Sequence, residues 1–299
     1  MMSENFNEFK NHAVGIHVSI SGRLDQSVER ALEVGSVGAF QIFTCSPRQW
    51  NASKLKSEEV DSFRKKVRQN KFQVFVHMPY LPNLSSPEEK FYSKSVEVLK
   101  REVSRCEELG VKNLVLHFGS HMGTSVESGQ KRIIQACNEA LHESSNSNVR
   151  LLLENSAGVK NSVGSEFPFI KKVIDETLDM NRIGVCFDTC HAFAAGYDLN
   201  SLDAVKKTVS DLDEQIGLEN LYLIHLNDSK GNIGDCLDRH EHIGKGKIGI
   251  SGMSAILNLK ELYHVPVVLE TPIDNDGDDK GDMATVKKLI QSSGQDYLL

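Results

Sequence analysis

Short apolar runs rich in β-branched residues recur along the chain. Most of these runs are nearly continuous, which is typical of strands buried on both faces of a parallel sheet. Eight are present, at residues 14–20, 39–44, 72–78, 113–119, 149–155, 183–189, 221–227 and 265–271. The pattern therefore predicts eight parallel strands.

A segment with helical character fits after each predicted strand. The clearest begins at Ser86, where Ser86-Pro87-Glu88-Glu89 has the spacing of a capping box with proline at the first helical position. Apolar residues then recur every three or four positions until Gly110, which is expected to end the helix. A second such segment runs from Leu202 to Gly217.

Eight strand–helix units predict an α/β protein with a single (β/α)8 TIM barrel, a fold of about 250 residues. A doubly wound open sheet is the rival. No G-x-G-x-x-G follows the first strand, which weakens a dinucleotide-binding version of that rival. We expect the barrel to occupy residues 14–299 and residues 1–13 to form an N-terminal extension.

Composition and charge limit the cellular compartment and the binding partners that we expect for this protein. The net charge of −7 argues against unaided attraction to nucleic acid, although bound divalent cations would change the local field. The chain has six cysteines but no C-x-x-C pair, and its N-terminal region has no apolar run of signal-peptide length. No segment approaches the roughly 20 apolar residues of a membrane span. These features predict a cytoplasmic protein with no membrane contact.

The carboxyl ends of barrel strands and the loops after them carry function in this fold. Six of the eight predicted strands deliver a histidine or a carboxylate to that end. The nine residues concerned are His77, His117, Glu154, Asp188, His191, His225, Asp238, His240 and Glu270.

Any one of these side chains is more often a hydrogen-bonded rim group than a metal ligand. Together they would crowd charge and buried imidazoles into one space unless cations balanced them. Five histidines with four carboxylates suit Zn, Mn or Fe better than Mg or Ca. Nine ligands exceed the three protein ligands of a typical catalytic zinc, so the pattern predicts two or three ions.

Cys186 and Cys190 offer a second interpretation, a small thiolate metal site or a redox pair. No further cysteine pair is present to complete a four-thiolate site. We therefore interpret both as buried, small apolar groups and take Asp188 and His191 as the functional pair of this stretch.

Long motifs give the chain a family resemblance. They are "QIFTCSPRQW", "HMPYLPNLS", "LHFGSH", "LLLENSAG", "GVCFDTCH", "HLNDSKGNIGDCLDRH", "HIGKGKIG" and "VLETP", and they occur in this order. From about Val14 onward the chain resembles the endonuclease IV family of zinc-dependent apurinic/apyrimidinic endonucleases. Asp235 departs from the pattern, because the family usually has a small residue after Gly234.

The resemblance implies three zinc ions per chain. His77, His117 and Glu154 would hold the first; Glu154, Asp188, His225 and Glu270 the second; and His191, Asp238 and His240 the third. Glu154 would bridge two ions, and Glu154 and Glu270 are the expected catalytic carboxylates. Whether Glu270 also orients or deprotonates the attacking water, or serves only as a ligand, stays open.

The resemblance also implies an activity and a substrate. The family hydrolyses the phosphodiester on the 5′ side of an abasic site in duplex DNA, leaving a 3′-hydroxyl and a 5′-deoxyribose phosphate, and it trims blocked 3′ ends. Zinc lowers the pKa of a bound water to about 7, so a hydroxide nucleophile would exist at neutral pH. We expect a monomer that acts on duplex DNA with abasic sites or blocked 3′ ends.

Recognition of DNA is expected from the loops at the same end of the barrel. By resemblance, Arg48 and Tyr80 enter the minor groove while the abasic nucleotide is flipped out, with Gln49 beside them. Lys245 or Lys247, with the amides of the neighbouring glycines, would reach phosphates; a plain turn is the competing interpretation. Trp50 is expected to pack on the following helix rather than on a base, and His17 and His121 to lie beside the ligands.

Two other functions fit parts of the pattern. A sugar isomerase or epimerase uses a similar metal-bearing barrel, but it would need about four ligands around one or two divalent ions. The further group formed by His191, Asp238 and His240 argues against it. A non-catalytic DNA- or phosphate-binding protein is the other alternative, and an intact ligand set weighs against it.

Overall fold

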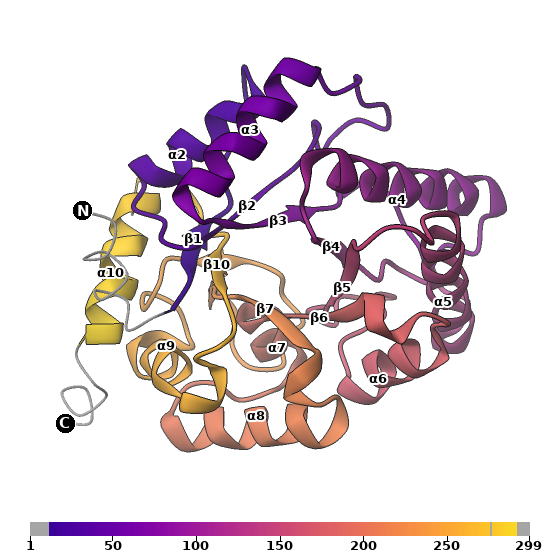
Figure 1. The fold of residues 1–299 in the computed structure, drawn as a ribbon. Helices are drawn as coiled ribbons and strands as arrows, with labels where there is room; N and C mark the ends of the chain where they lie inside the picture. The colour runs from indigo at the N-terminus through magenta and orange to yellow at the C-terminus, as the bar shows by residue number, and fades with distance from the viewer. Residues whose placement is uncertain (1–11, 276, 292–299) are drawn as a thin grey trace.

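The computed structural model describes residues 12–275 and 277–291 (Figure 1). All eight predicted strands are present, each slightly shorter than its apolar run. They are β1 (Val14–Ile16), β2 (Ala39–Ile42), β3 (Gln73–His77), β4 (Asn113–His117), β5 (Arg150–Glu154), β6 (Ile183–Asp188), β7 (Leu221–His225) and β10 (Val267–Leu269).

The strands form a closed parallel barrel. Their order is β1-β10-β7-β6-β5-β4-β3-β2. A parallel bridge between His17 and Gln41 joins the two ends of this sheet, and Val18 N donates to Gln41 O at 2.9 Å. Closure confirms the (β/α)8 barrel and excludes the open doubly wound sheet.

Helices surround the strands in a ring (Figure 1). At least one follows each barrel strand, as the apolar periodicity predicts, and β6 is followed by two. They are α2 (Ser27–Glu33), α3 (Ser57–Asn70), α4 (Glu89–Leu109), α5 (Val126–Glu143), α6 (Phe167–Glu176), α7 (Thr189–Ala195), α8 (Leu202–Gln215), α9 (Gly249–Asn258) and α10 (Asp279–Gln291). A short antiparallel pair, β8 (Asp228–Ser229) with β9 (His240–Glu241), lies in the chain after β7.

The predicted start of α4 is wrong by three residues. The helix begins at Glu89 rather than at Ser86, although Gly110 ends it in the left-handed conformation with φ of 71° as expected. Ser86 accepts from Glu88 N at 3.2 Å inside a turn. The preceding Ser85 donates to Phe118 O at 2.8 Å, just beyond β4. A contact to a neighbouring strand thus holds these serines outside the helix.

The barrel interior below its carboxyl end is filled with apolar side chains. Seven strands each contribute one fully buried residue to a ring made of Ala39, Phe75, Val115, Leu152, Cys186, Leu223 and Val268. A larger apolar layer lies between the strands and the helices. The apolar ring lies below the carboxyl-end mouth of the barrel, where functional residues are found in this fold.

Gly15 permits the contact between the first two strands. A Cβ at this position would lie 1.9 Å from the carbonyl oxygen of Ala39. Gly15→Ala is therefore expected to lower the free energy of unfolding by about 1–3 kcal/mol, the usual cost of overpacking. Denaturant unfolding measures this, with Gly281→Ala inside α10 as the control, which should be neutral or stabilising. Equal stability of the two variants would contradict tight closure at Gly15.

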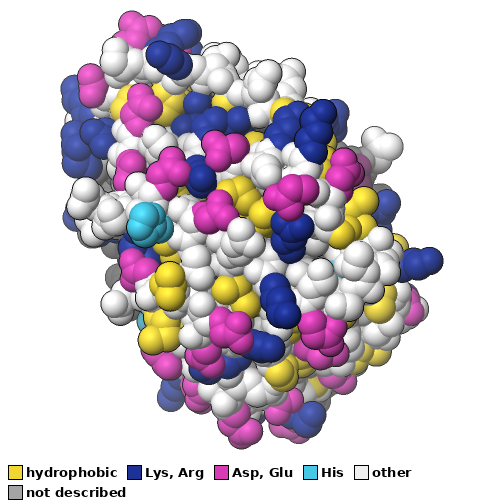
Figure 2. All heavy atoms as spheres, turned by 90° about the vertical axis from the view of Figure 1, so that its right-hand side faces the viewer, with side chains coloured by type: hydrophobic (Ala, Val, Ile, Leu, Met, Phe, Trp, Pro, Cys, Tyr) yellow, Lys and Arg dark blue, Asp and Glu magenta, His cyan; other side chains and the backbone are white. Residues whose placement is uncertain are grey.

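The outer surface carries mixed charge. On the side where α4, α5 and α6 lie, basic and acidic side chains are interspersed and neither sign gathers (Figure 2). This side therefore offers no extended basic surface. None of the helices within the described residues is long and apolar enough to cross a membrane.

The expected N-terminal extension falls largely on residues 1–11, which lie outside the described residues. Its last two residues, His12 and Ala13, are described. His12 is buried, with its ring edge-on to Tyr263 at 4.9 Å, and Ala13 O accepts from Val267 N at 2.8 Å.

Candidate metal centre

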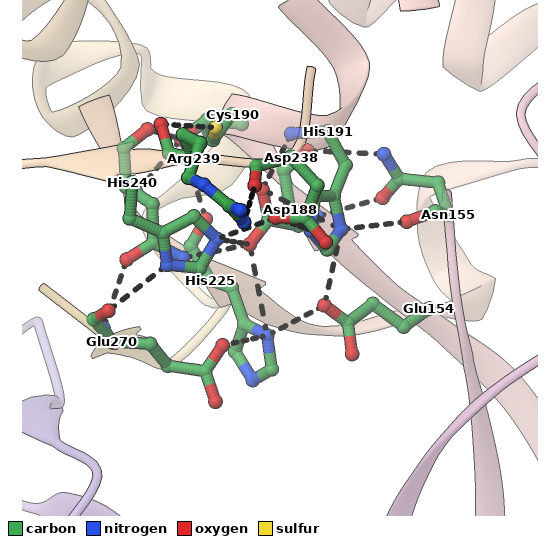
Figure 3. Close-up of polar contacts among 12 residues, drawn as sticks. Glu154, Asn155, Asp188, Cys190, His191, His225, Asp238, Arg239, His240 and Glu270 are labelled. Carbon is green, nitrogen blue, oxygen red and sulfur yellow. Dashed lines mark hydrogen bonds and ion pairs between the residues drawn. The ribbon is translucent and has the colours of Figure 1, made fainter. Parts of the chain in front are cut away.

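The nine histidines and carboxylates expected at the carboxyl end of the barrel do meet there. Most of them converge around Glu154 and Asp188 in Figure 3. Their possible ligand atoms form three groups, and within each group these atoms lie within 4.8 Å of one another. The groups are His77, His117 and Glu154; Glu154, Asp188, His225 and Glu270; and His191, Asp238 and His240.

Glu154, at the end of β5, joins the first two groups. Its Oε2 lies 3.0 Å from His77 Nε2 and 3.6 Å from His117 Nδ1. Its Oε1 lies 3.2 Å from His225 Nδ1 on the other side. The two oxygens of one buried carboxylate therefore face different ligand groups, which is the arrangement of a bridging ligand.

Glu270, which directly follows β10, completes the second group. Its Oε2 lies 3.2 Å from His225 Nδ1. Asp188, at the end of β6, approaches the same nitrogen at 4.0 Å. The backbone of Glu270 also serves the third group, because its carbonyl accepts from His240 Nδ1 at 2.9 Å.

The third group lies toward the outside of the mouth. His191 Nε2 is 3.2 Å from Asp238 Oδ1, and His240 Nε2 is 3.8 Å from the same oxygen. His191 is buried in the first turn of α7, whereas the Asp238 side chain is 52% exposed. A bound substrate would therefore meet this group first.

The histidine rings are oriented as metal ligands are. His77 Nδ1 bonds Met78 O at 2.7 Å, and His191 Nδ1 bonds Asn155 O at 3.0 Å. His225 Nε2 bonds Gln41 Oε1 at 2.9 Å. In each case an oxygen holds one ring nitrogen and the other faces the cluster, the usual arrangement around a metal-bound histidine.

His240 gives the clearest test of whether a cation fits. Its Nε2 is buried and has no hydrogen-bond partner among the described residues. The nearest acceptor recorded for it, Asp188 Oδ2, is 3.7 Å away, too far for a hydrogen bond. A buried polar atom is rarely left without a partner, so the residues present fit a bound cation.

Charge in the cluster is balanced by internal pairs. Burial opposes a charge on Glu154, but the imidazoles of His117 and His225 outweigh it and hold the pKa of this carboxyl well below its usual range. Burial likewise opposes protonation of His191, yet Asp188, Asp238 and Glu154 raise its pKa well above the ordinary value. A divalent cation would take over the compensation that protonated histidines otherwise provide.

Three amide side chains that support the cluster were missed in the sequence. Gln41 Nε2 donates to Glu270 Oε1 at 2.7 Å, so this buried residue of β2 links Glu270 to His225. Asn227 Nδ2 donates to Asp188 Oδ2 at 2.7 Å, and Asn155 Oδ1 accepts from Asp188 N at 2.7 Å. Each asparagine lies one or two positions after a ligand-bearing strand end, a signal that could have found them.

The cysteines behave as interpreted. Cys186 belongs to the apolar ring inside the barrel, and Cys190 Sγ donates to Arg239 O at 3.6 Å. Cys190 also lies within reach of Asp188 and His240 as a further possible metal group. Burial raises the pKa of the Cys190 thiol to about 12, which disfavours the thiolate form that binds metal.

Known proteins are similar to this chain in sequence and in fold. A family model described as a xylose isomerase-like TIM barrel matches residues 28–292. A protein of Nitrosopumilus maritimus (strain SCM1) named "Probable endonuclease 4" is 45% identical over 279 residues, which are 92% of this chain and 99% of that protein. The chain belongs to the endonuclease IV family.

Solved structures agree with this assignment. The crystal structure of endonuclease IV from Thermus thermophilus is 32% identical, covers 93% of this chain and 99% of that one, and has a TM-score of 0.83. A D-tagatose 3-epimerase-like protein has a TM-score of 0.71 at 19% identity, covering 94% of this chain and 99% of that one. The second likeness shows the fold alone.

In this endonuclease IV family member the expected DNA-contacting residues lie on the loops that follow β2, β3 and β9. Tyr80 is 58% exposed, and its ring centre is 5.8 Å from that of His77. Arg48 and Gln49 are exposed on the loop after β2. Lys245 is exposed on the loop after β9.

Trp50 packs as expected, but on a different helix. Its ring meets Phe91 of α4 edge-on at 5.2 Å, and Lys94 Nζ lies 4.1 Å from its ring centre. The prediction that it packs on the following helix, α3, is wrong. The loop after β2 packs on α4, because this helix supplies an aromatic partner for Trp50. The helix also carries Arg101, which donates to Trp50 O at 2.6 Å.

His17 lies beside the ligands, whereas among the described residues no hydrogen bond or ring contact joins His121 to them. His17 Nδ1 is 3.3 Å from Glu270 Oε1 and 3.0 Å from Gln41 Nε2. His121 N donates to Asn161 O of the loop after β5, and no hydrogen bond joins its buried Nδ1 to another group in the described chain. Its expected place next to the ligands is not supported.

The glycine-rich loop after β9 does not offer its amides to phosphate. The amides of Gly244, Gly246 and Ile248 each donate to the carboxylate of Asp228 at 3.0 Å, and Gly249 N does so at 3.2 Å. Asp228 is fully buried. The expectation that these glycine amides reach phosphates is therefore wrong, because a carboxylate of the same chain occupies them.

Asp228→Asn removes the carboxylate that accepts these backbone hydrogen bonds. The asparagine NH₂ would face N–H donors, so we expect the free energy of unfolding to fall by about 3 kcal/mol. Amide hydrogen exchange of residues 242–249 should accelerate. The control is Asp235→Asn on the exposed loop nearby, which should change neither quantity. Unchanged exchange in Asp228→Asn would show that the loop holds its shape without the carboxylate.

Proposed function

We propose that the protein is a zinc-dependent AP endonuclease. It hydrolyses the phosphodiester 5′ to an abasic site in duplex DNA, leaving a 3′-hydroxyl and a 5′-deoxyribose phosphate, and it also removes blocking groups from 3′ ends. It uses three zinc ions per chain. The observation that carries the proposal is the junction at Glu154, whose two oxygens face two ligand groups while a third lies beside them.

Family membership supports the nuclease class directly. Relatives named endonuclease 4 match along almost their whole length, so the protein is a DNA-repair nuclease of this family. The likeness to an epimerase extends to the fold only. The group of His191, Asp238 and His240, which a mono- or dinuclear sugar epimerase would not need, favours the nuclease.

The three groups would hold the ions in the sets that the structure brings together. When bound, zinc ions supply Lewis acidity, which activates water near neutral pH and stabilises charge on a phosphodiester. Glu154 belongs to the first two sets and would contribute one oxygen to each. The outer set, with the exposed Asp238, lies where a phosphate would enter.

Glu270 is the carboxylate best placed to act on the attacking water. Gln41 Nε2 donates to its Oε1 at 2.7 Å, and His17 Nδ1 lies 3.3 Å from the same oxygen. Its Oε2 remains directed at His225 within the cluster. With one oxygen held by the amide of Gln41, the other can orient a water or accept its proton, which is the geometry a general base requires.

A side-by-side assay separates the proposed activity from its alternatives. The purified protein is incubated with a duplex that contains one abasic site and, separately, with a set of ketoses. Cleavage of the duplex without change in the ketoses is expected. Interconversion of ketoses without DNA cleavage would support the epimerase, and binding of the duplex with neither reaction would support a non-catalytic protein.

Arg48 and Tyr80 are proposed to fill the gap beside the flipped abasic nucleotide. Arg48→Ala and Tyr80→Ala should each weaken incision at an abasic site by about 10-fold or more, since unstacking and flipping cost a few kcal/mol. Removal of a blocked 3′ nucleotide at a frayed end should suffer less, because less wedging is required there.

Both activities are measured for both variants. Arg68→Ala on α3 and Tyr263→Ala, which precedes β10, replace residues remote from the mouth and serve as controls. Equal losses on the two substrates would mean that Arg48 and Tyr80 contact only the DNA backbone. That result would contradict the proposal that they fill the gap beside the flipped nucleotide.

A further inference from the structure

The loop that carries Arg48 and Gln49 does not hold its own shape. We call residues 44–53, between β2 and α3, the recognition loop. It has no helix or strand, and in the described chain one backbone hydrogen bond, from Gln49 N to Ser46 O at 3.3 Å, lies within it. Its conformation must therefore be imposed by groups outside it.

Arg105 of α4 supplies the largest part of this restraint. Its Nε donates to Thr44 Oγ1 at 2.7 Å, and its Nη2 donates to Thr44 O at 2.6 Å. Its Nη1 donates to Ser53 O at 2.8 Å. A single buried guanidinium thus ties the first and last residues of the recognition loop together, and only the planar fork of arginine can make these three bonds at once.

Glu102 and Arg101, also on α4, hold the start of the recognition loop and Trp50. The fully buried Glu102 accepts from Thr44 Oγ1 and from Cys45 Sγ, the latter at 3.7 Å. It also pairs with Arg101 Nη2 at 3.0 Å. Arg101 Nη1 in turn donates to Trp50 O at 2.6 Å.

The tip of the recognition loop, Arg48 and Gln49, makes far fewer contacts than its base, the two ends at Thr44 and Ser53. Arg48 and Gln49 are exposed, and within the described residues neither side chain makes a hydrogen bond or an ion pair. The neighbouring Trp50 packs on Phe91 and Lys94 of α4. Buried charged bonds therefore fix the base, while the two polar side chains at the tip are left for a ligand.

We propose that Arg101, Glu102 and Arg105 form a positioning cluster that presents Arg48 to damaged DNA. This inference rests on the proposed function, which it deepens by naming what sets the geometry of recognition. A loop already held in its binding conformation loses less conformational entropy on binding, so the cluster contributes to affinity without touching DNA. None of the three residues lies among the nine at the metal centre.

Arg105→Lys is the test variant, because it keeps the positive charge beside Thr44 and Glu102 but cannot form the three-bonded fork. The matched control is Arg182→Lys. Arg182 is equally buried and also donates to backbone carbonyls, those of Val149, Leu141 and Ser144, but it lies just before β6 at the other end of the barrel. Both changes should lower stability, so stability alone does not distinguish them.

Binding to an abasic duplex distinguishes them. Arg105→Lys should weaken the affinity of the metal-loaded protein by about 10- to 100-fold. This is the size of effect expected when a contacting side chain, here Arg48, is displaced by about an ångström. Arg182→Lys should change it by less than about 2-fold. The turnover rate on a blocked 3′ end should stay within about 2-fold of wild type in both variants, because the metal centre is intact. Hydrogen exchange of residues 45–53 should accelerate in Arg105→Lys alone.

A double-mutant cycle with Arg48→Ala measures the coupling directly. Adding Arg48→Ala to Arg105→Lys should cost little further affinity, because a displaced Arg48 no longer contributes. Full additivity, or equal affinities of Arg105→Lys and Arg182→Lys, would overturn the inference. If Arg105→Lys fails to fold, Arg101→Gln, at a partly exposed site, replaces it in the same cycle. Absence of incision by the wild-type protein would instead overturn the proposed function itself.

Discussion

Replacing Glu270 with glutamine is expected to reduce incision of abasic DNA by about 10²- to 10⁴-fold, the range that positioned acid–base groups contribute. The substitution keeps the size of the side chain and an oxygen that can accept from Gln41. It removes the negative charge and the oxygen directed at His225. Affinity for the abasic duplex should remain, because Glu270 does not lie among the residues expected to contact DNA.

Single-turnover incision and duplex binding are measured on the same preparation, together with its metal content. Glu241→Gln, on the neighbouring strand β9 but outside the nine, is the control and should retain activity. Ordinary turnover by Glu270→Gln with full metal content would remove Glu270 from the chemistry. Loss of metal with loss of turnover would assign it the role of ligand alone.

Metal removal is the second change with a large expected effect. Protein purified without chelators should contain three ions per chain, mostly zinc, and chelation should abolish incision. Stability should fall as well, since a ligand that binds only the folded state at 1,000 times its Kd contributes about 4 kcal/mol. Without cations, Glu154, Asp188 and Glu270 would crowd together with only protonated histidines to balance them.

Elemental analysis gives the ion count, and thermal unfolding with and without chelator gives the stability difference. Adding zinc back should restore both activity and unfolding temperature. One ion or none in protein never exposed to chelator would contradict the three-ion assignment. An unchanged unfolding temperature after complete metal loss would contradict the stabilisation that we assign to the bound ions.

The barrel and the convergence of the nine residues could be predicted from the sequence because both depend on local patterns. Near-continuous apolar runs identify buried parallel strands, and the carboxyl ends of such strands meet at one mouth. His77, Glu154 and His225 are the last residues of β3, β5 and β7, so their meeting followed from the fold.

The sequence could not show the contacts between a local motif and side chains far away in the chain. These contacts decide which structure the motif adopts. Ser86 has the spacing of a helix cap, but the contact of Ser85 with Phe118 near β4 decides where α4 begins. The glycines of the loop after β9 look like a phosphate-binding turn, but Asp228 fills that turn from the chain itself. Gln41 gives no signal in β2, because only barrel closure brings it beside Glu270.

The most direct test of the account is the chemical identity of the ends that the protein makes. A duplex with a single abasic site, labelled at the 5′ end of the damaged strand, is incubated with metal-loaded protein and the labelled fragment is analysed. We expect a fragment that ends one nucleotide before the abasic site in a 3′-hydroxyl that a DNA polymerase can extend, with the sugar phosphate left on the downstream 5′ end. A fragment that keeps a sugar remnant at its 3′ end, or an uncut duplex, would contradict hydrolysis 5′ to the lesion at this metal centre.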